Sequence, residues 1–116
     1  MIFLAPSPIH GVGVFTDAPI SKDTRPDLWH PGDLKFVPKY EAQGESYAMY
    51  CVETKDGYWC PRDFRCMSLG WYLNHSENPS LIAEGEDYAA ARDISPGEEL
   101  TIDYATLDAE VDNRVR

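Results

Sequence analysis

The sequence predicts a mainly β fold with short helices, arranged as one domain over residues 1–116. Short segments rich in β-branched and aromatic residues recur along the chain, and Pro, Gly, Asn and Asp residues separate them. Prolines are spaced through residues 19–46 and exclude a long helix there. A chain of 116 residues also suits a single core of modest size.

The N-terminal segment is expected to form two strands, over residues 2–5 and 14–16, because both stretches are apolar and favour β structure. Gly11 and Gly13 frame one valine between these strands. Two such glycines allow either a tight turn or a close backbone approach to another group. Taken alone, they indicate a hairpin.

Residues 19–46 are interpreted as an irregular, loop-rich insertion with a brief strand at residues 34–37. Residues 47–53 favour a strand. Asp56-Gly57 is then a strong two-residue hairpin signal before the β-favouring residues 58–60. We therefore expect a β-hairpin in the middle of the chain.

Two further strands are expected in the C-terminal part. Residues 88–91, together with Ile94, form the first of them. Residues 100–104 alternate apolar and polar side chains, as a half-buried strand does. Between the two, residues 95–98 (Ser-Pro-Gly-Glu) place Pro and Gly as a type II turn requires.

The tail, residues 105–116, predicts a short helix. Leu107, Val111 and Val115 recur every four residues and form an apolar stripe, and Thr106 can cap its start. A helix of this length is marginal in water, so it must dock on its own domain or on a partner.

The net charge is −10, from 20 acidic and 10 basic residues. An acidic surface repels phosphate backbones, so direct nucleic-acid binding is not expected, whereas basic proteins would be attracted. Taken alone, the acidity is explained most simply by solubility. No apolar run has the length of a membrane span or of a signal-peptide core, so we expect an intracellular, cytoplasmic protein without a membrane partner.

The cysteines Cys51, Cys60 and Cys66 contain no Cys-x-x-Cys pair. An odd number without clustered partners argues against both a zinc knuckle and a disulfide scaffold. We expect reduced, partly buried thiols.

A polar cluster ends the apolar run at Leu73. Asn74, His75 and Ser76 come directly after it, and burying three such side chains is costly unless each is paired. The cluster therefore either satisfies a buried turn or holds a ligand. About thirty residues later a predicted strand ends in Tyr104, and the combination suggests a site.

Three motifs stand in order along the chain: Gly-Val-Gly-Val-Phe at residues 11–15, Asn-His-Ser at residues 74–76, and Glu-Leu-Thr-Ile-Asp-Tyr at residues 99–104. This order and spacing resemble the SET-domain protein-lysine methyltransferases. In its shortness the chain looks like the small stand-alone SET proteins of bacteria and some viruses. The resemblance implies several small β-sheets with a C-terminal pseudoknot, and it is poor only within residues 19–46.

The resemblance also implies a cofactor, S-adenosyl-L-methionine, and the residues around it. Asn74 would bond the methionine moiety, the His75 main chain would meet the adenine, and Tyr104 would be the catalytic tyrosine beside the transferring methyl group. The other expected cofactor contacts are the backbone at His10, Gly11, Val12 and Gly13 and the side chains of Trp71 and Tyr72.

The implied chemistry needs a neutral lysine amine, and a free lysine is almost fully protonated at neutral pH. An apolar channel and a nearby sulfonium both disfavour the ammonium form, so no dedicated general base is required. Tyr47 and Tyr50 are candidates to line that channel. Because they are three residues apart in a predicted strand, at most one points inward, and Tyr47 is preferred.

Two departures from the family pattern are visible. Glu77 stands where the family often has a cysteine of a zinc site, and no later cysteine cluster is present, so no metal is expected. Residues 105–116 contain no aromatic, although the family usually closes the lysine channel there. The apolar stripe, a second subunit joined as a homodimer through the tail, or an open site are the alternatives.

The leading hypothesis is therefore a lysine methyltransferase that acts on a basic, histone-like or ribosomal protein. The alternative is a non-enzymatic SET-like module that binds basic proteins through its acidic surface. A metal-dependent hydrolase is not favoured, because His10, His30 and His75 do not share ligand spacing.

Overall fold

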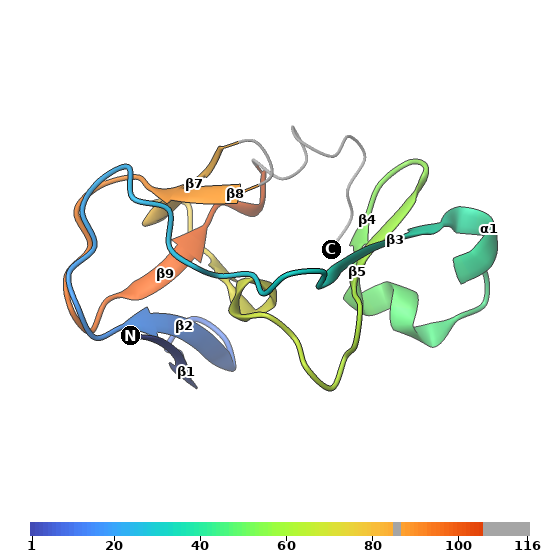
Figure 1. Ribbon diagram of the computed structural model, residues 1–116, viewed down its shortest axis with the longest axis horizontal. Coiled ribbons are helices and arrows are strands. Elements are labelled where there is room, and N and C mark those ends of the chain that lie inside the picture. Colours follow the sequence, from blue (N-terminus) through green and yellow to red (C-terminus); the bar gives the residue numbers. More distant parts are fainter. Residues whose placement is uncertain (85–86, 106–116) are drawn as a thin grey trace.

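The computed structural model describes residues 1–84 and 87–105, and within them the chain is mainly β with a few short helices. The strands form three small sheets (Figure 1). This architecture confirms the predicted fold class. The helix expected in the tail, and the homodimer contact expected through it, fall on residues 106–116 and lie outside the described residues.

The first sheet joins segments from both ends of the described chain. Its strand order is β1-β2-β9-β6, so β9 lies between β2 and β6. Figure 1 shows β9 next to β2. β9 runs antiparallel to β2 and parallel to β6. Placing the last strand in the interior of the sheet is the arrangement that the expected pseudoknot needs. The bounds are β1 Ile2–Pro6, β2 Val12–Thr16, β6 Asn74–His75 and β9 Glu99–Ile102.

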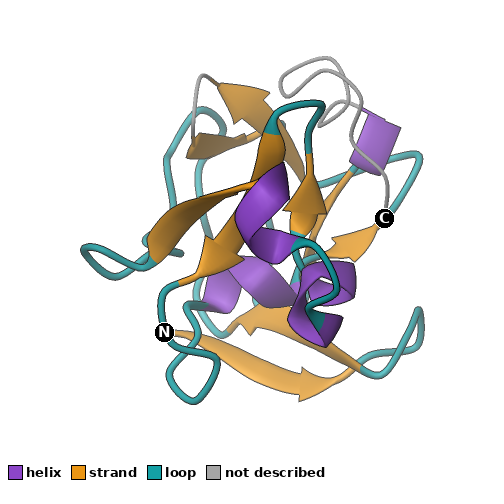
Figure 2. Cartoon of the chain, turned by 90° about the vertical axis from the view of Figure 1, so that its right-hand side faces the viewer, coloured by secondary structure: helices purple, strands orange, loops and turns teal. Residues whose placement is uncertain are grey.

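The second sheet lies at the other end of the molecule in Figure 1, with order β3-β5-β4. Two short helices accompany it, α1 and the 3₁₀ helix η1. The third sheet is the hairpin β7-β8, and β7 contacts β9. Figure 2 shows the molecule from the end that carries the second sheet, with its strands and short helices distinguished by colour. The bounds are β3 Leu34–Pro38, α1 Lys39–Ala42, η1 Ser46–Tyr50, β4 Val52–Glu53, β5 Gly57–Pro61, the 3₁₀ helix η2 Leu69–Tyr72, β7 Leu81–Glu84 and β8 Asp87–Ala90.

Buried apolar side chains form two clusters instead of the single core expected. The larger one packs under the first sheet and includes Val14, Leu73 and Leu100. The smaller one packs between β5, α1 and η1 and includes Cys51 and Cys60. The second sheet therefore has an apolar interior of its own.

The strand expected over residues 47–53 is wrong for most of its length. Residues 46–50 form η1, and only Val52–Glu53 pair as strand β4. Gly44 adopts a φ of 80°, after which the amide of Ala48 bonds the carbonyl of Glu45. This turn directs Tyr47 toward the smaller cluster, so packing overrides the β propensity of the segment.

The two predicted turns differ in outcome. Gly97 has a φ of 84° and the amide of Glu98 bonds the carbonyl of Ser95 at 3.1 Å, which confirms the type II turn. The central hairpin exists, but Thr54 pairs with Gly57 across the turn, one position earlier than Asp56-Gly57 predicts. Gly57 is needed for packing instead, since a Cβ there would lie 2.4 Å from the carbonyl oxygen of Val37.

The first two strands, the strand β3, and strands β8 and β9 are confirmed within one or two residues of the expected bounds, except that Ile94 lies beyond β8 and forms an isolated bridge with Ile20. Strand β7 was not expected from the sequence. None of the helices in the described ranges is long and apolar enough to cross a membrane.

Candidate active site

Asn74 lies at the centre of the candidate site and is almost fully buried. Its side-chain amide donates to the carbonyl oxygens of His10 at 3.1 Å and Val12 at 3.0 Å, and to Glu99 Oε2 at 2.9 Å. Its backbone pairs with Thr101 in the parallel ladder of β6 and β9. One asparagine thus joins the glycine turn, the Asn-His-Ser segment and the last strand.

Glu99 is the acidic partner in this junction, and the sequence reasoning missed it. Its carboxylate accepts hydrogen bonds from the Ser7 hydroxyl at 2.8 Å and from Asn74. A Cβ on Gly13 would lie 2.2 Å from Glu99 Oε2 and 3.1 Å from the Asn74 amide nitrogen. The glycine at position 13 therefore leaves room for two side chains of the protein itself.

Gly11 is different. It has a φ of 46°, and no atom lies within 4 Å of the position that its Cβ would occupy. The turn that carries it is exposed, and Ile9 and Val12 beside it are each about half exposed. This turn leaves a backbone surface open to a ligand.

His75, the last residue of β6, and Tyr104, two residues after β9, are held together. The amide of Tyr104 donates to His75 Nδ1 at 3.0 Å, and the two rings lie 5.2 Å apart between centroids. Because Nδ1 accepts this bond, the neutral ring carries its proton on Nε2. Asp103 Oδ1 lies 3.7 Å from the same Nδ1.

The hydroxyl of Tyr104 donates to the carbonyl oxygen of Leu73 at 2.7 Å. Leu73 is buried and directly precedes Asn74, so the predicted catalytic tyrosine is fixed to the predicted cofactor segment. Ser80, which follows the Asn-His-Ser segment, is also joined to β9. Its buried hydroxyl donates to the carbonyl oxygen of Glu99 at 3.1 Å and accepts from the amide of Thr101 at 3.0 Å.

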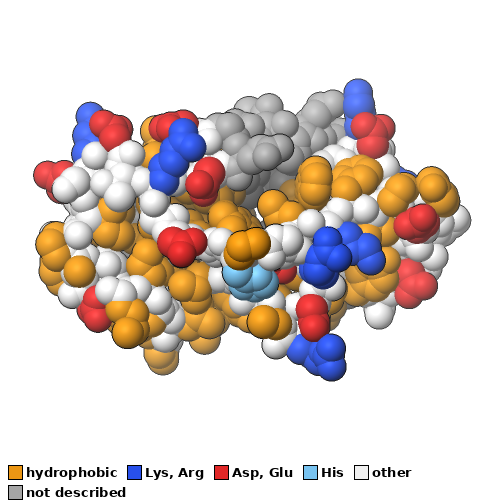
Figure 3. All heavy atoms as spheres, viewed as in Figure 1, with side chains coloured by type: hydrophobic (Ala, Val, Ile, Leu, Met, Phe, Trp, Pro, Cys, Tyr) orange, Lys and Arg blue, Asp and Glu red, His pale blue; other side chains and the backbone are white. Residues whose placement is uncertain are grey.

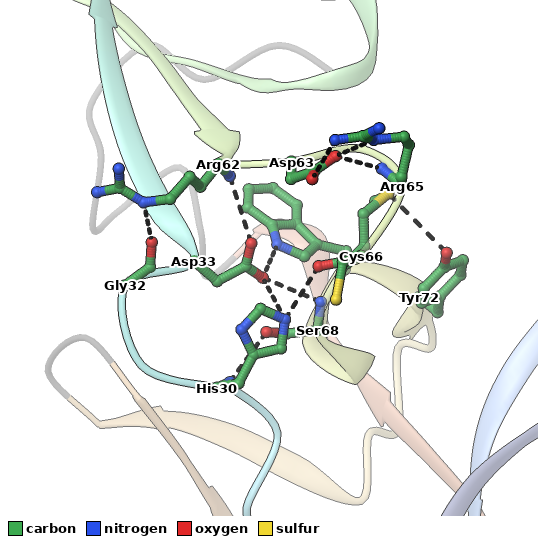
Figure 4. Close-up of polar contacts among 11 residues, drawn as sticks. His30, Gly32, Asp33, Arg62, Asp63, Arg65, Cys66, Ser68 and Tyr72 are labelled. Atoms are coloured by element: carbon green, nitrogen blue, oxygen red, sulfur yellow. Dashed lines mark hydrogen bonds and ion pairs between the residues drawn. The ribbon is translucent and has the colours of Figure 1, made fainter.

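Trp71 and Tyr72 are in η2, the turn that leads into this segment. The indole N–H of Trp71 donates to Asp33 Oδ2 at 2.9 Å, and its ring packs edge-on against Trp29. The Tyr72 hydroxyl lies 3.9 Å from the sulfur of Met67 (Figure 4). Both residues are partly buried.

Tyr47 and Tyr50 lie on η1 beside the second sheet, at the opposite end of the ribbon from β9 (Figure 1). Tyr47 packs near Phe64, and burial raises the pKa of its hydroxyl, with nearby acidic groups adding to the effect. Tyr50 is 64% exposed. No described contact joins either residue to Tyr104, and the alternation argument does not apply to a 3₁₀ helix. Their channel role stays a prediction.

The residues present fit a bound S-adenosylmethionine. The amide of Asn74 is used in donor bonds, and its Oδ1 has no hydrogen-bond partner among the described residues, which leaves an acceptor for an ammonium group. Glu99 adds a carboxylate next to it, and the Gly11 turn adds accessible backbone. Within residues 1–84 and 87–105, no three His, Cys, Asp or Glu side chains could hold a metal ion.

The sequence reasoning missed Ser7, Glu99 and Asp33. Glu99 had one available signal, since a carboxylate immediately before the buried strand residue Leu100 must find partners. Ser7 and Asp33 had none, because each is 35 or more residues from its partner in the site region.

Comparison with known proteins identifies the family to which the chain belongs. The family model of the SET domain matches residues 11–105, and the chain belongs to the SET domain family. SET domains form a family of lysine methyltransferases and typically use S-adenosylmethionine.

Among solved structures, the fold is similar to that of a Plasmodium falciparum protein described as a "putative histone methyltransferase". The TM-score is 0.59 and the identity 17%, over 90% of this chain and 96% of that chain. At this identity the likeness shows the fold alone. A search of curated proteins gives no match.

Proposed function

We propose that the protein transfers a methyl group from S-adenosylmethionine to a lysine side chain of a basic protein. The observation that supports this most directly is the junction at Asn74, where the glycine turn, the Asn-His-Ser segment and β9 meet. Tyr104 is fixed within the same junction through Leu73 and His75. On this proposal, the junction would bring the bound cofactor and the Tyr104 hydroxyl together.

When bound, the cofactor supplies a methyl group on a sulfonium centre. The turn at residues 9–12 and the Asn74 carboxamide would bind it, and Glu99 would balance its positive charge. The hydroxyl hydrogen of Tyr104 is directed to Leu73, so the hydroxyl oxygen is oriented to accept from a polarised C–H or N–H group. Positioning of this type can supply most of the barrier reduction in a two-substrate reaction.

A basic substrate fits the charge of the chain. At −10 the protein attracts lysine-rich segments over the range of the Debye length, which favours histone-like or ribosomal proteins as the substrate class. Attraction of this kind raises the association rate more than the final affinity.

Thermal denaturation tests the cofactor half of the proposal. A ligand that binds only the folded state at 100 times its Kd adds about 2.7 kcal/mol of stability. S-adenosylmethionine and its demethylated product should therefore both raise Tm by several degrees. Folded protein whose Tm does not change at millimolar concentrations of either compound would contradict the proposal.

Transfer itself is tested with a methyl-labelled cofactor and a mixture of basic proteins from a lysate. The wild-type chain should label lysine residues, and Tyr104→Phe should reduce labelling by at least tenfold while cofactor binding is retained. The matched control is Tyr40→Phe, because Tyr40 is 77% exposed and far along the chain from the junction. Equal labelling by the wild type and Tyr104→Phe would remove Tyr104 from the mechanism.

The second candidate is a non-enzymatic module that binds basic proteins through its acidic surface, and the net charge of −10 favours it. On the face shown in Figure 3, however, acidic side chains are dispersed among basic and apolar ones and form no single patch. This candidate predicts salt-sensitive capture of basic proteins with no label transferred.

A further inference from the structure

Asp33 is the most deeply buried acidic side chain among the described residues, with 2% of its surface exposed. It lies in the segment before β3, within the insertion that has no counterpart in the family motifs. Its Oδ2 accepts from the backbone amide of Ser68 and from the Trp71 indole, both at 2.9 Å. Its Oδ1 accepts from the Arg62 amide at 3.3 Å (Figure 4).

These donors fix the charge state of the carboxyl group. Burial alone raises the pKa of Asp33, but the hydrogen bonds from Ser68, Trp71 and Arg62 outweigh burial and lower the pKa overall. The ionised group is therefore the stable form at neutral pH. A buried carboxylate stays ionised only where its hydrogen-bond donors are fixed in position. The carboxylate in turn fixes the positions of those donors.

The bonds of Asp33 span long stretches of sequence. Ser68 lies 35 residues from Asp33 and directly precedes η2. Trp71 lies 38 residues from Asp33 and is within η2. The Ser68 hydroxyl accepts from the His30 amide at 3.0 Å, and His30 Nε2 bonds the carbonyl oxygen of Cys66 at 3.0 Å (Figure 4). The insertion therefore bonds both the backbone at the start of η2, through Ser68, and a side chain of η2, that of Trp71.

The segment directly after η2 belongs to the candidate site. The chain passes from Trp71 through Tyr72 to Leu73, whose carbonyl oxygen accepts the Tyr104 hydroxyl, and then to Asn74. A shift of η2 moves that carbonyl and that asparagine together. A displacement of about 1 Å is enough to slow an oriented reaction by about a hundredfold.

We propose that Asp33 is a positioning residue of the methyl-transfer site, which sets the orientation of Trp71 and the placement of η2 before Asn74. It touches neither cofactor nor substrate and acts through Trp71 and Ser68. The assignment rests on the proposed function for its catalytic consequence, whereas the coupling of Asp33 to Trp71 is independent of that function.

The test is a double-mutant cycle with Asp33→Asn and Trp71→Phe, measured on cofactor affinity in protein shown to be folded. Each single change should weaken cofactor binding by about tenfold, since both remove the charge-assisted hydrogen bond between Asp33 and the Trp71 indole, while phenylalanine keeps an aromatic ring where Trp71 is expected to contact the cofactor. The double variant should bind about as weakly as either single variant, because the two changes are not independent. Additive losses would overturn the proposal.

Asp63→Asn is the matched control. Asp63 is an acidic residue of the same region, but its side chain is 42% exposed and, among the described residues, bonds only to the nearby Arg65 (Figure 4). It should leave cofactor affinity unchanged. A purely structural role for Asp33 would lower Tm and leave the affinity of the folded fraction at the wild-type value, and that result would also overturn the proposal.

Tryptophan emission separates this proposal from the proposed function. Asp33→Asn should shift the emission of the wild-type chain and should cause no shift in the Trp71→Phe background. If no form of the protein binds cofactor, the proposed function fails, while the emission result still decides the coupling. If Asp33→Asn does not fold, Trp71→Phe carries the test alone, and unchanged cofactor affinity in that variant overturns the proposal.

Discussion

The Tyr104 hydroxyl donates a hydrogen bond to the carbonyl oxygen of Leu73 at 2.7 Å, across 31 residues of sequence. The bond joins the end of β9 to the segment between η2 and β6. It determines where the tyrosine oxygen lies relative to Asn74, the next residue in the chain. The same bond makes a contribution to stability that can be measured separately from activity.

Tyr104→Phe should lower the free energy of unfolding by about 1 kcal/mol, because a partly buried carbonyl loses its donor. Urea unfolding of the wild type and the variant measures this difference. Tyr40→Phe should have no measurable effect, since that side chain is exposed. A loss of several kcal/mol at Tyr104 would indicate that the ring and not the hydroxyl is displaced.

Gly13→Ala should destabilise the protein by about 2 kcal/mol and weaken cofactor binding, because the added methyl displaces the Glu99 carboxylate from Ser7 and Asn74. Thermal unfolding and cofactor titration measure the two effects.

Gly11→Ala is the comparison for this change. The space around Gly11 is open, but its φ is 46°. The substitution should therefore lower the free energy of unfolding by roughly 1 kcal/mol through backbone strain alone. Equal losses at the two positions would show that the contact with Glu99 is not the cause.

Stability should fall in acid through Asp33. Its pKa is lower in the folded state than the value of about 4 in an unfolded chain, so its contribution is fully present above pH 4 and is lost as the pH falls through the folded value. His30, whose Nε2 lies 3.9 Å away, is a titratable side chain that faces this carboxylate, beside the donors from Ser68, Trp71 and Arg62.

Urea unfolding from pH 7 to pH 2 checks this. Asp33→Asn should be less stable than the wild type at pH 7, and the difference should shrink as the pH falls. A difference that stays constant over this range would mean that the carboxylate charge contributes nothing.

The thiols should differ in reactivity. Cys66 is exposed, whereas Cys51 and Cys60 are each 2% exposed, and burial raises the pKa of the Cys60 thiol. An aromatic disulfide reagent should react with one thiol per folded chain quickly and with the other two only after unfolding. Cys66→Ser should abolish the fast phase, and a fast phase that persists in this variant would contradict the burial of the other two.

The sequence alone predicted those structural features that depend on neighbouring residues or on a family motif. Gly97 marks its turn because only a glycine readily adopts the φ required there. Asn74 and Tyr104 were expected in the site through the family motifs, and the structure brings them into one junction. Their expected contacts with the cofactor stay predictions.

The remaining features depend on contacts between distant segments. Residues 46–50 have the composition of a strand and form η1 because Tyr47 packs on the smaller cluster. The pairing of β6 with β9 involves two residues of β6, too few for a periodic signal. Asp33 shows no pattern at all, since its partners are fixed only when the insertion packs against η2.

The interior position of β9 has a consequence for how the protein folds. β2 and β6 each pair with β9 and not with one another, so until β9 arrives β2 has β1 as its one partner in this sheet and β6 has none. During synthesis the ribosome releases β9 after every other strand described. Such late, long-range pairing is typical of slow folding, and until it occurs the edges of β2 and β6 remain open to association with other chains.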